Sequence, residues 1–321
     1  MTEKILILGA AGRLGKACAK AFRDAGWDVI SFVRAGADMR AAEGTTVIQG
    51  DALDDEDVLA AAKGASVILN AVNFPFGQWP AKILPQNAVA IAAAEATGAT
   101  LMLPGNLFVY GKDMPPEIDE TTPMHPQSRK GKLRLAVEQK IAVSSARTIT
   151  LRAGDFFGGT NFGSWFDLVI ARDVDLGVVR YPGPLLVPHA WAYLPDLAET
   201  FVKLAEKRDT LEQHAVFGFP GHPASGFELL AAIRAAMQKG LKRRSFPWFM
   251  LWLGSPFIAN WREIVEVSHL WKRPNRIDGT KLQAAIGDIP ETEFHHAVTQ
   301  ALDDLALRRT TGNIAPASTA D

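Results

Sequence analysis

Cysteine is almost missing from this chain of 321 residues, in which Cys18 is the single example. An intramolecular disulfide is therefore excluded, and we expect a reducing compartment, because stable disulfides belong to oxidising ones. Long apolar runs are missing as well. The most apolar later segment, residues 246–258, is shorter than the ~20 residues that cross a bilayer, and it contains prolines and a glycine. With no signal-peptide pattern at the N-terminus, the sequence predicts a cytoplasmic protein without stable membrane insertion.

A charge excess of either sign is also lacking. Lys and Arg together number 34 against 35 Asp and Glu, which gives a net charge of -1. Because a chain without a basic excess cannot neutralise many phosphates, no nucleic-acid partner is expected. One local exception, residues 239–244, is basic and leads into Phe246 and Trp248. We interpret it as a solvated loop followed by a buried aromatic anchor. The spacing of His, Cys and acidic residues indicates no metal site.

What the first half does contain is an alternation of short apolar segments with segments of helical periodicity. This alternation predicts an α/β fold, a Rossmann doubly wound parallel sheet with helices on both faces. Ligands bind such sheets at the carboxyl ends of the strands. The expected strands are residues 4–8, 28–33, 46–49, 66–72, 100–103 and 148–152. The expected helices are residues 14–25, a helix opened by Asp54 and Asp55, residues 84–97 and residues 129–145.

The second half is less regular, and its pattern indicates a smaller C-terminal substrate lobe. We assign this lobe to residues 156–309, partly interleaved with the sheet of a first domain over residues 1–155. Residues 310–321 are small and polar and are expected to be disordered. Helices are expected in the lobe at residues 196–208, 226–239, 279–286 and 292–308, and a strand at 215–218.

A glycine-rich loop joins the first expected strand to the first helix. Gly9 allows the tight turn, Gly12 lets the backbone approach a pyrophosphate, and Gly15 lets helix and strand pack closely. The start of the helix supplies unpaired N–H groups and the positive end of a dipole. In this context the pattern predicts that residues 1–155 bind NAD(P). The loop residues expected to touch the cofactor are Gly9, Ala11, Gly12, Arg13, Leu14 and Gly15.

The end of the second expected strand indicates which dinucleotide is bound. An acidic residue there would favour NAD(H) through the adenosine ribose, but this strand ends in Arg34. A guanidinium can pair with a 2′-phosphate in bidentate fashion, and Arg13 could reach the same phosphate. We therefore predict NADP(H) in preference to NAD(H). The alternative is that both arginines are ordinary surface residues.

Further cofactor contacts are expected where the third and fourth strands end. Asp51, next to Ala52, could accept a hydrogen bond from the adenine amino group or could simply cap the following helix. Ala71, Val72 and Asn73 are expected to line the central stretch of the cofactor, because small residues let the backbone lie close to a ligand.

Together these features resemble the extended short-chain dehydrogenase/reductase family, which contains nucleotide-sugar epimerases and dehydratases. The resemblance covers the first half well and the rest loosely. With Arg34 at the end of its second expected strand, the sequence also resembles the NADP-linked atypical branch, which includes isoflavone-reductase-like and NmrA-like proteins. The resemblance implies an active site with a Ser or Thr, a Tyr and a Lys. The segments that carry the family resemblance are residues 9–15, Gly50-Asp51, Val109-Tyr110-Gly111, and residues 132–139, 151–158 and 287–292.

Two of those three catalytic positions differ in this chain. Lys132 matches the family lysine, whereas Ser128 stands at the tyrosine position and Asn106 at the Ser/Thr position. Serine is a poor acid–base group because its pKa lies far from neutrality. The resemblance implies that Lys132 holds the nicotinamide ribose. Ser128 and Lys132 share a helix face, so Lys132 could also act as an acid directly, through Ser128 or through water. Asn106 can donate its amide to a developing oxyanion. Tyr110 is a reserve proton donor, with local packing as the alternative.

Aromatic side chains gather near the expected nicotinamide end. Such a lining suits a small apolar or aromatic substrate better than a sugar nucleotide, although core packing is the alternative. His189 is also a candidate proton shuttle. The candidate substrate residues are Phe74, Phe76, Phe156, Phe157, His189 and Trp191.

These expectations lead to one main hypothesis and two rivals. The main hypothesis is an NADP(H)-dependent oxidoreductase acting on a small carbonyl, enone or alcohol with a non-standard proton donor. One rival is a catalytically silent NADP(H)-binding regulatory protein, which the lost tyrosine would favour. The other is an epimerase or dehydratase of the sugar-nucleotide type. A homodimer is left open.

Overall fold

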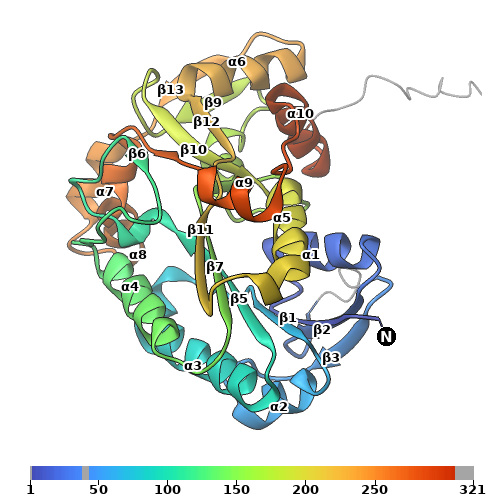
Figure 1. Ribbon diagram of the computed structural model, residues 1–321. Coiled ribbons are helices and arrows are strands. Elements are labelled where there is room, and N and C mark those ends of the chain that lie inside the picture. The colour runs from blue at the N-terminus through green and yellow to red at the C-terminus, as the bar shows by residue number, and fades with distance from the viewer. Residues whose placement is uncertain (1, 38–42, 308–321) are drawn as a thin grey trace, which may run out of the picture.

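A parallel sheet of seven strands forms the centre of the computed structural model, which describes residues 2–37 and 43–307 (Figure 1). The strand order is β11-β7-β5-β4-β1-β2-β3, and every neighbouring pair is parallel. The order reverses at β1, which places the ligand crevice of a doubly wound sheet beside the end of β1. The strands are β1 Lys4–Leu8, β2 Asp28–Val33, β3 Thr46–Gln49, β4 Val67–Asn70, β5 Thr100–Asn106, β7 Thr148–Ala153 and β11 His214–Gly218.

Helices cover both faces of this sheet. One face carries α1 (Arg13–Asp24) and α5 (Leu194–Lys207), and the other carries α2 (Asp55–Ala62), α3 (Trp79–Thr97) and α4 (Arg129–Ala142). Each face of the sheet has its own hydrophobic core, and alternate residues of β1 belong to the two cores. Ile5 and Ile7 face α1 and α5, whereas Leu6 and Leu8 face the opposite layer of helices. Since each fully buried side chain of this kind stabilises the fold by ~1.5–3 kcal/mol, strands that are apolar on both faces fix the sheet in the centre.

The second lobe has small sheets and an aromatic core of its own. Its main sheet has the order β12-β10-β8, while β13 pairs with β9 and β14 with β6. The strands are β6 Glu117–Ile118, β8 Asp155–Phe157, β9 Val178–Tyr181, β10 Pro188–Tyr193, β12 His222–Ser225, β13 Lys242–Ser245 and β14 Arg276–Ile277. The helices are α6 Gly226–Met237, α7 Trp248–Gly254, α8 Ala259–Glu266, α9 Thr280–Ile286 and α10 Phe294–Asp304. Shorter turns are η2 Phe76–Gln78, η3 Leu107–Val109, η4 Phe166–Ile170, η5 Arg208–Thr210 and η6 Ser268–Trp271.

The predicted fold class is confirmed, with some differences in the elements. Two elements beyond residue 156 complete the first domain: β11 extends the sheet beside β7, and α5 packs against α1. The helix expected from residue 84 begins at Trp79, because prolines at Pro80 and Pro85 are accommodated in its first turns. Residues 242–245, expected to be a loop, form β13, and α7 and α8 were not expected.

Two further expectations concern the C-terminal tail and the membrane. The predicted disordered tail, residues 310–321, lies outside the described residues. Within the described ranges, none of the helices combines the length and the hydropathy needed to cross a membrane.

Candidate functional site

The glycine loop holds the start of α1 tightly against the ends of β1 and β4. Gly9 has a φ of +77°, and a Cβ atom there would lie 3.0 Å from the nitrogen of Val72 and 3.1 Å from the carbonyl carbon of Ala71. A Cβ atom on Gly15 would collide with the carbonyl oxygen of Gly9. Both positions therefore require glycine for close backbone packing.

The first turn of α1 has the character of an anion site. Gly12 is its N-cap and is exposed, so no side chain caps the helix, and no acidic residue lies in the first turn. The N–H groups of that turn have no partners within the helix, and the positive end of the helix dipole is not neutralised. This start lies at the switch point of the sheet, where a pyrophosphate fits.

The side chain of Arg13 reaches from this turn to the second lobe. Its guanidinium donates to the carbonyl oxygen of Gly158 over 2.7 Å and lies 3.2 Å from the Asp167 carboxylate. Asp167 is fully buried and also accepts from the backbone nitrogen of Ser164 over 3.0 Å. Burial lowers the pKa of Arg13, an effect that Asp167 partly offsets. Arg13 is thus engaged with the lobe, whereas Arg34 is exposed just after β2.

The turn after β3, which the sequence predicts beside the adenosine, is ordered by a hydrogen bond within it. The Asp51 carboxylate accepts from the backbone nitrogen of Leu53 over 2.9 Å, and the residue is exposed. Asp54, not Asp51, caps α2 by accepting from two backbone nitrogens of its first turn. The capping alternative for Asp51 therefore does not apply, and adenine recognition stays a prediction. Ala52 is half-buried against the core.

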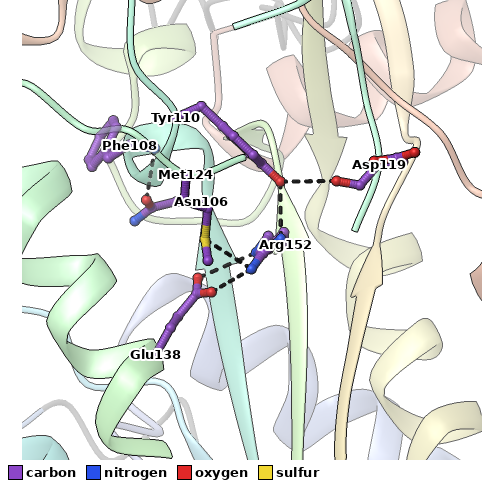
Figure 2. A network of polar contacts seen from close by, with 7 residues as sticks. All are labelled: Asn106, Phe108, Tyr110, Asp119, Met124, Glu138 and Arg152. Carbon is purple, nitrogen blue, oxygen red and sulfur yellow. Dashed lines mark hydrogen bonds and ion pairs between the residues drawn. The ribbon is translucent and has the colours of Figure 1, made fainter. Parts of the chain in front are cut away.

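The segments after β4 and β5 are the ones that the sequence predicts beside the nicotinamide. Ala71 and Val72 are half-buried and Asn73 is exposed. At the end of β5, the Asn106 side-chain oxygen accepts from the Phe108 nitrogen over 3.0 Å and caps η3 (Figure 2). Its oxygen is occupied, so the amide nitrogen is the end that can donate to a ligand.

Tyr110 is buried in a polar network that connects the residue after η3 with β7 and α4 (Figure 2). Its hydroxyl donates to the Asp119 carbonyl oxygen over 3.3 Å and accepts from Arg152 over 3.1 Å. Arg152 is held in turn by the Glu138 carboxylate at 2.6 Å. Burial raises the pKa of Tyr110, and the Arg152 guanidinium partly opposes this effect. The Tyr110 hydroxyl both donates and accepts a hydrogen bond inside the network. We therefore do not assign Tyr110 a catalytic role.

The start of α4 separates the two residues that the resemblance assigned to catalysis. Ser128 is the buried N-cap, and its hydroxyl accepts from the nitrogen of Gly131 over 3.0 Å. Lys132 is exposed. Gly131 packs so closely on η3 that a Cβ atom would collide with the Phe108 carbonyl oxygen. The structure does not bring Lys132 into the layer between α4 and the strand ends, so its expected role remains a prediction.

Two cations of α4 that the sequence interpretation missed pack against the aromatic side chains of η2 and α3. The Lys130 side chain is 1% exposed, lies 3.5 Å from the centre of the Phe76 ring and donates to the Glu263 carbonyl oxygen over 2.7 Å. The Glu263 carboxylate is 3.2 Å away. Burial lowers the pKa of Lys130 to about 8, although Glu263 opposes this effect. Arg134 lies 4.7 Å from the Trp79 ring, and burial lowers its pKa to about 10.

A spacing rule could have found these two cations. Lys130 and Arg134 are four residues apart on α4 and therefore share one face of that helix. Their aromatic partners, Phe76 in η2 and Trp79 at the start of α3, are three residues apart in consecutive helical turns.

The candidate substrate residues fall into two groups. Phe157, Trp191 and His189 are buried in the second lobe. His189 pairs with the Asp155 carboxylate at 2.7 Å and stacks on Trp271, with ring centres 4.3 Å apart. These three side chains offer no open surface to a substrate, so they act in packing. The half-buried candidates are Phe74, Phe76 and Phe156. Among residues 2–37 and 43–307, no group of His, Cys, Asp and Glu is arranged to hold a metal ion.

The fold has close counterparts among solved structures. The UDP-glucose 4-epimerase of Brucella ovis, solved with NAD, has a TM-score of 0.74 and is 14% identical, with 94% of this chain and 97% of that chain covered. The enzyme WbmH of Bordetella bronchiseptica, solved with NAD+, has a TM-score of 0.73 and is 16% identical, with 95% and 98% covered. At these identities the likeness shows the fold alone, and it agrees with the doubly wound α/β fold predicted from the sequence.

Sequence comparison adds a relative and a family. A 3-diazoavenalumate denitrifying reductase from Streptomyces sp is 27% identical over 209 residues. The match covers 59% of this chain and 66% of that protein, so the chain spans just under two thirds of the relative's length. The model of the NmrA-like family matches residues 1–267. With more than half of its length matched, the chain belongs to the NmrA-like family.

Proposed function

We propose that this protein is an NADP(H)-dependent oxidoreductase that acts on a small carbonyl, enone or alcohol substrate. The observation that carries the proposal is the uncapped start of α1 at the switch point of the sheet. Three features there fit a dinucleotide: exposed Gly12, the glycine packing of Gly9 and Gly15, and the absence of acidic residues in the first turn. When bound, the nicotinamide would supply or accept the hydride.

The preference for NADP(H) rests on Arg34. It is exposed immediately after β2, on the strand next to β1, where the adenosine ribose of a dinucleotide bound at α1 would lie. A guanidinium there favours a 2′-phosphate through charge-assisted hydrogen bonds. Since Arg13 is paired with Asp167, Arg34 carries the selectivity.

The proton donor is proposed to be a cation of α4. Lys130 lies beside Phe76 in the loop after β4, and its pKa of about 8 suits a group that gives up a proton near neutrality. Because the Lys130 side chain is 1% exposed, this role requires the half-buried Phe76 to move aside when the substrate binds. Asn106 would donate its amide to the substrate oxygen. The half-buried Phe74, Phe76 and Phe156 would supply an apolar lining for the substrate.

The Streptomyces relative supports redox chemistry over epimerisation, because its name describes a reductase. The fold is shared with epimerases, but an apolar lining of Phe74, Phe76 and Phe156 suits a small apolar substrate better than a sugar nucleotide.

Calorimetry with the two cofactors tests the first part of the proposal. NADPH is expected to bind at least tenfold more tightly than NADH, and Arg34→Ala should remove most of that difference while leaving NADH affinity unchanged. Lys20→Ala, an exposed cation on α1, is the matched control. Equal affinity for both cofactors would refute the NADP(H) preference. Tight NADPH binding without turnover of any aldehyde, ketone or enone would favour the silent binding protein.

A further inference from the structure

A large apolar surface lies on α7 and the turn after it. Single exposed apolar side chains are ordinary, but here six of the ten residues 249–258 are large, apolar and exposed. Phe257 is the most open, with 89% of its surface exposed. We call this set the α7 surface. It consists of Phe249, Met250, Trp252, Leu253, Phe257 and Ile258.

The helix is attached to the rest of the lobe along one edge. Leu251 is the buried residue of α7, and Trp248 anchors its start by donating from Nε1 to the Pro182 carbonyl oxygen over 2.5 Å. On the other side, α7 packs against α8 so closely that a Cβ atom on Gly254 would collide with the Trp261 ring. The exposed side chains of the α7 surface are therefore carried by a helix that is fixed to the lobe. This helix lies at the edge of the molecule (Figure 1).

Exposed positive charge flanks this surface along the chain. Residues 239–276 contain eight basic residues, all exposed, in a chain whose net charge is -1. The two acidic residues of the same segment have partners elsewhere: Glu263 pairs with Lys130, and Glu266 accepts from the backbone nitrogen of Arg129 over 3.1 Å. The segment thus presents an unbalanced positive charge. The basic residues are Lys239, Lys242, Arg243, Arg244, Arg262, Lys272, Arg273 and Arg276.

We infer that the α7 surface and its basic flank dock the protein on an anionic lipid surface. Apolar and aromatic side chains of an interfacial helix enter the boundary between headgroups and acyl chains, while lysines and arginines bind the phosphates. A protein docked in this way lies on the membrane surface and needs no helix that spans the bilayer. The charge argues against a second copy as the occupant, because a symmetric contact would place the basic flank of one chain near that of the other.

Vesicle sedimentation with the full chain tests this inference. The protein is expected to bind vesicles of phosphatidylcholine with phosphatidylglycerol, to bind phosphatidylcholine alone at least tenfold more weakly, and to be released as salt rises. Phe257→Ser and Trp252→Ser should each weaken binding by about tenfold, the effect of keeping one large apolar side chain out of the membrane. Arg243→Glu/Arg244→Glu should weaken it further.

The matched control is Val143→Ser, which removes an equally exposed apolar side chain at the end of α4. It should leave vesicle binding unchanged, and the folding of every variant is checked by its thermal melting curve. Equal binding to both vesicle types, or no binding to either, would overturn the inference. A dimer in solution that Phe257→Ser dissociates, without vesicle binding, would assign the α7 surface to a second copy instead.

Discussion

At the scale of single residues, the buried Lys130 is the unusual feature of this site. A lysine that is 1% exposed must be compensated, and Phe76 and Glu263 surround its ammonium. Lys132, two positions further along α4, is solvated. The two lysines share a helix and a charge but differ in burial, which makes each the natural control for the other.

We predict that Lys130→Met lowers the maximal rate of carbonyl reduction by about 10²-fold or more, the usual contribution of a general acid. The wild-type rate should fall as pH rises through about 8, because the folded-state pKa is lowered to that value and the neutral amine cannot donate a proton. This limb of the pH profile should vanish in Lys130→Met. Rates of reduction measured between pH 6 and 10 give both quantities.

Lys132→Met is the control for this prediction, because it removes the same charge from the exposed face. We expect it to keep the limb near pH 8. If Lys132→Met abolishes the limb and Lys130→Met does not, the lysine matched by the family resemblance is the acid. NADPH affinity, measured in parallel, separates either result from a loss of cofactor binding.

How far the sequence determines the site differs between these residues. The close packing of Gly9 and Gly15 could be predicted because a tight turn and a short distance between strand and helix leave no alternative to glycine. The choice between Lys130 and Lys132 could not, because two positions turn an α-helix by about 200°. Which of them faces inward depends on where α4 docks, and tertiary contacts decide that.

At the scale of elements, the start of α4 is fixed by its contact with η3. Gly131 lies against the carbonyl oxygen of Phe108, and the Ser128 hydroxyl caps the same turn. This contact orients Lys130 and Arg134 toward Phe76 and Trp79. Short elements such as α7 and α8 were missed for a related reason: helices of this length are marginal alone and form through tertiary packing.

We predict that Gly131→Ala destabilises the protein by about 1–3 kcal/mol, because the added methyl group must push α4 away from η3. Urea denaturation measures the free energy of unfolding. Gly240→Ala is the control, since a Cβ atom there meets nothing within 4 Å and the backbone is not in the left-handed region. Equal effects of the two substitutions would contradict the close packing of α4 on η3.

At the scale of the whole molecule, the two lobes are joined across the start of α1. The Arg13 side chain is 12% exposed and its partner Asp167 is fully buried, so their ion pair is shielded from solvent. Lys16 adds a longer contact to Asn161 at 3.4 Å. The cofactor loop and the second lobe are therefore coupled through residues of the loop itself.

We predict that Arg13→Leu lowers the free energy of unfolding by about 3–5 kcal/mol, because it leaves the Asp167 carboxylate buried without a cation. Arg13→Leu/Asp167→Asn should recover much of this loss, since asparagine removes the charge and keeps an acceptor for the Ser164 nitrogen. Urea denaturation of both variants supplies the comparison. A cost below about 1 kcal/mol for Arg13→Leu would indicate a pair that behaves as if solvated.

The contribution of β11 and α5 to the first domain has a consequence for synthesis on the ribosome. When residues 1–155 have emerged, β7 is still an open edge, and the apolar side of α1 lacks the helix that covers it. Such an intermediate exposes the unpaired backbone of β7 and the apolar side chains of α1 until roughly sixty further residues are synthesised, since β11 ends at residue 218. Exposed groups of this kind favour aggregation. The first domain can therefore be completed only after β11 and α5 have been synthesised. A ribosome pause within that interval lengthens the time for which the apolar surface stays exposed and a chaperone would protect it.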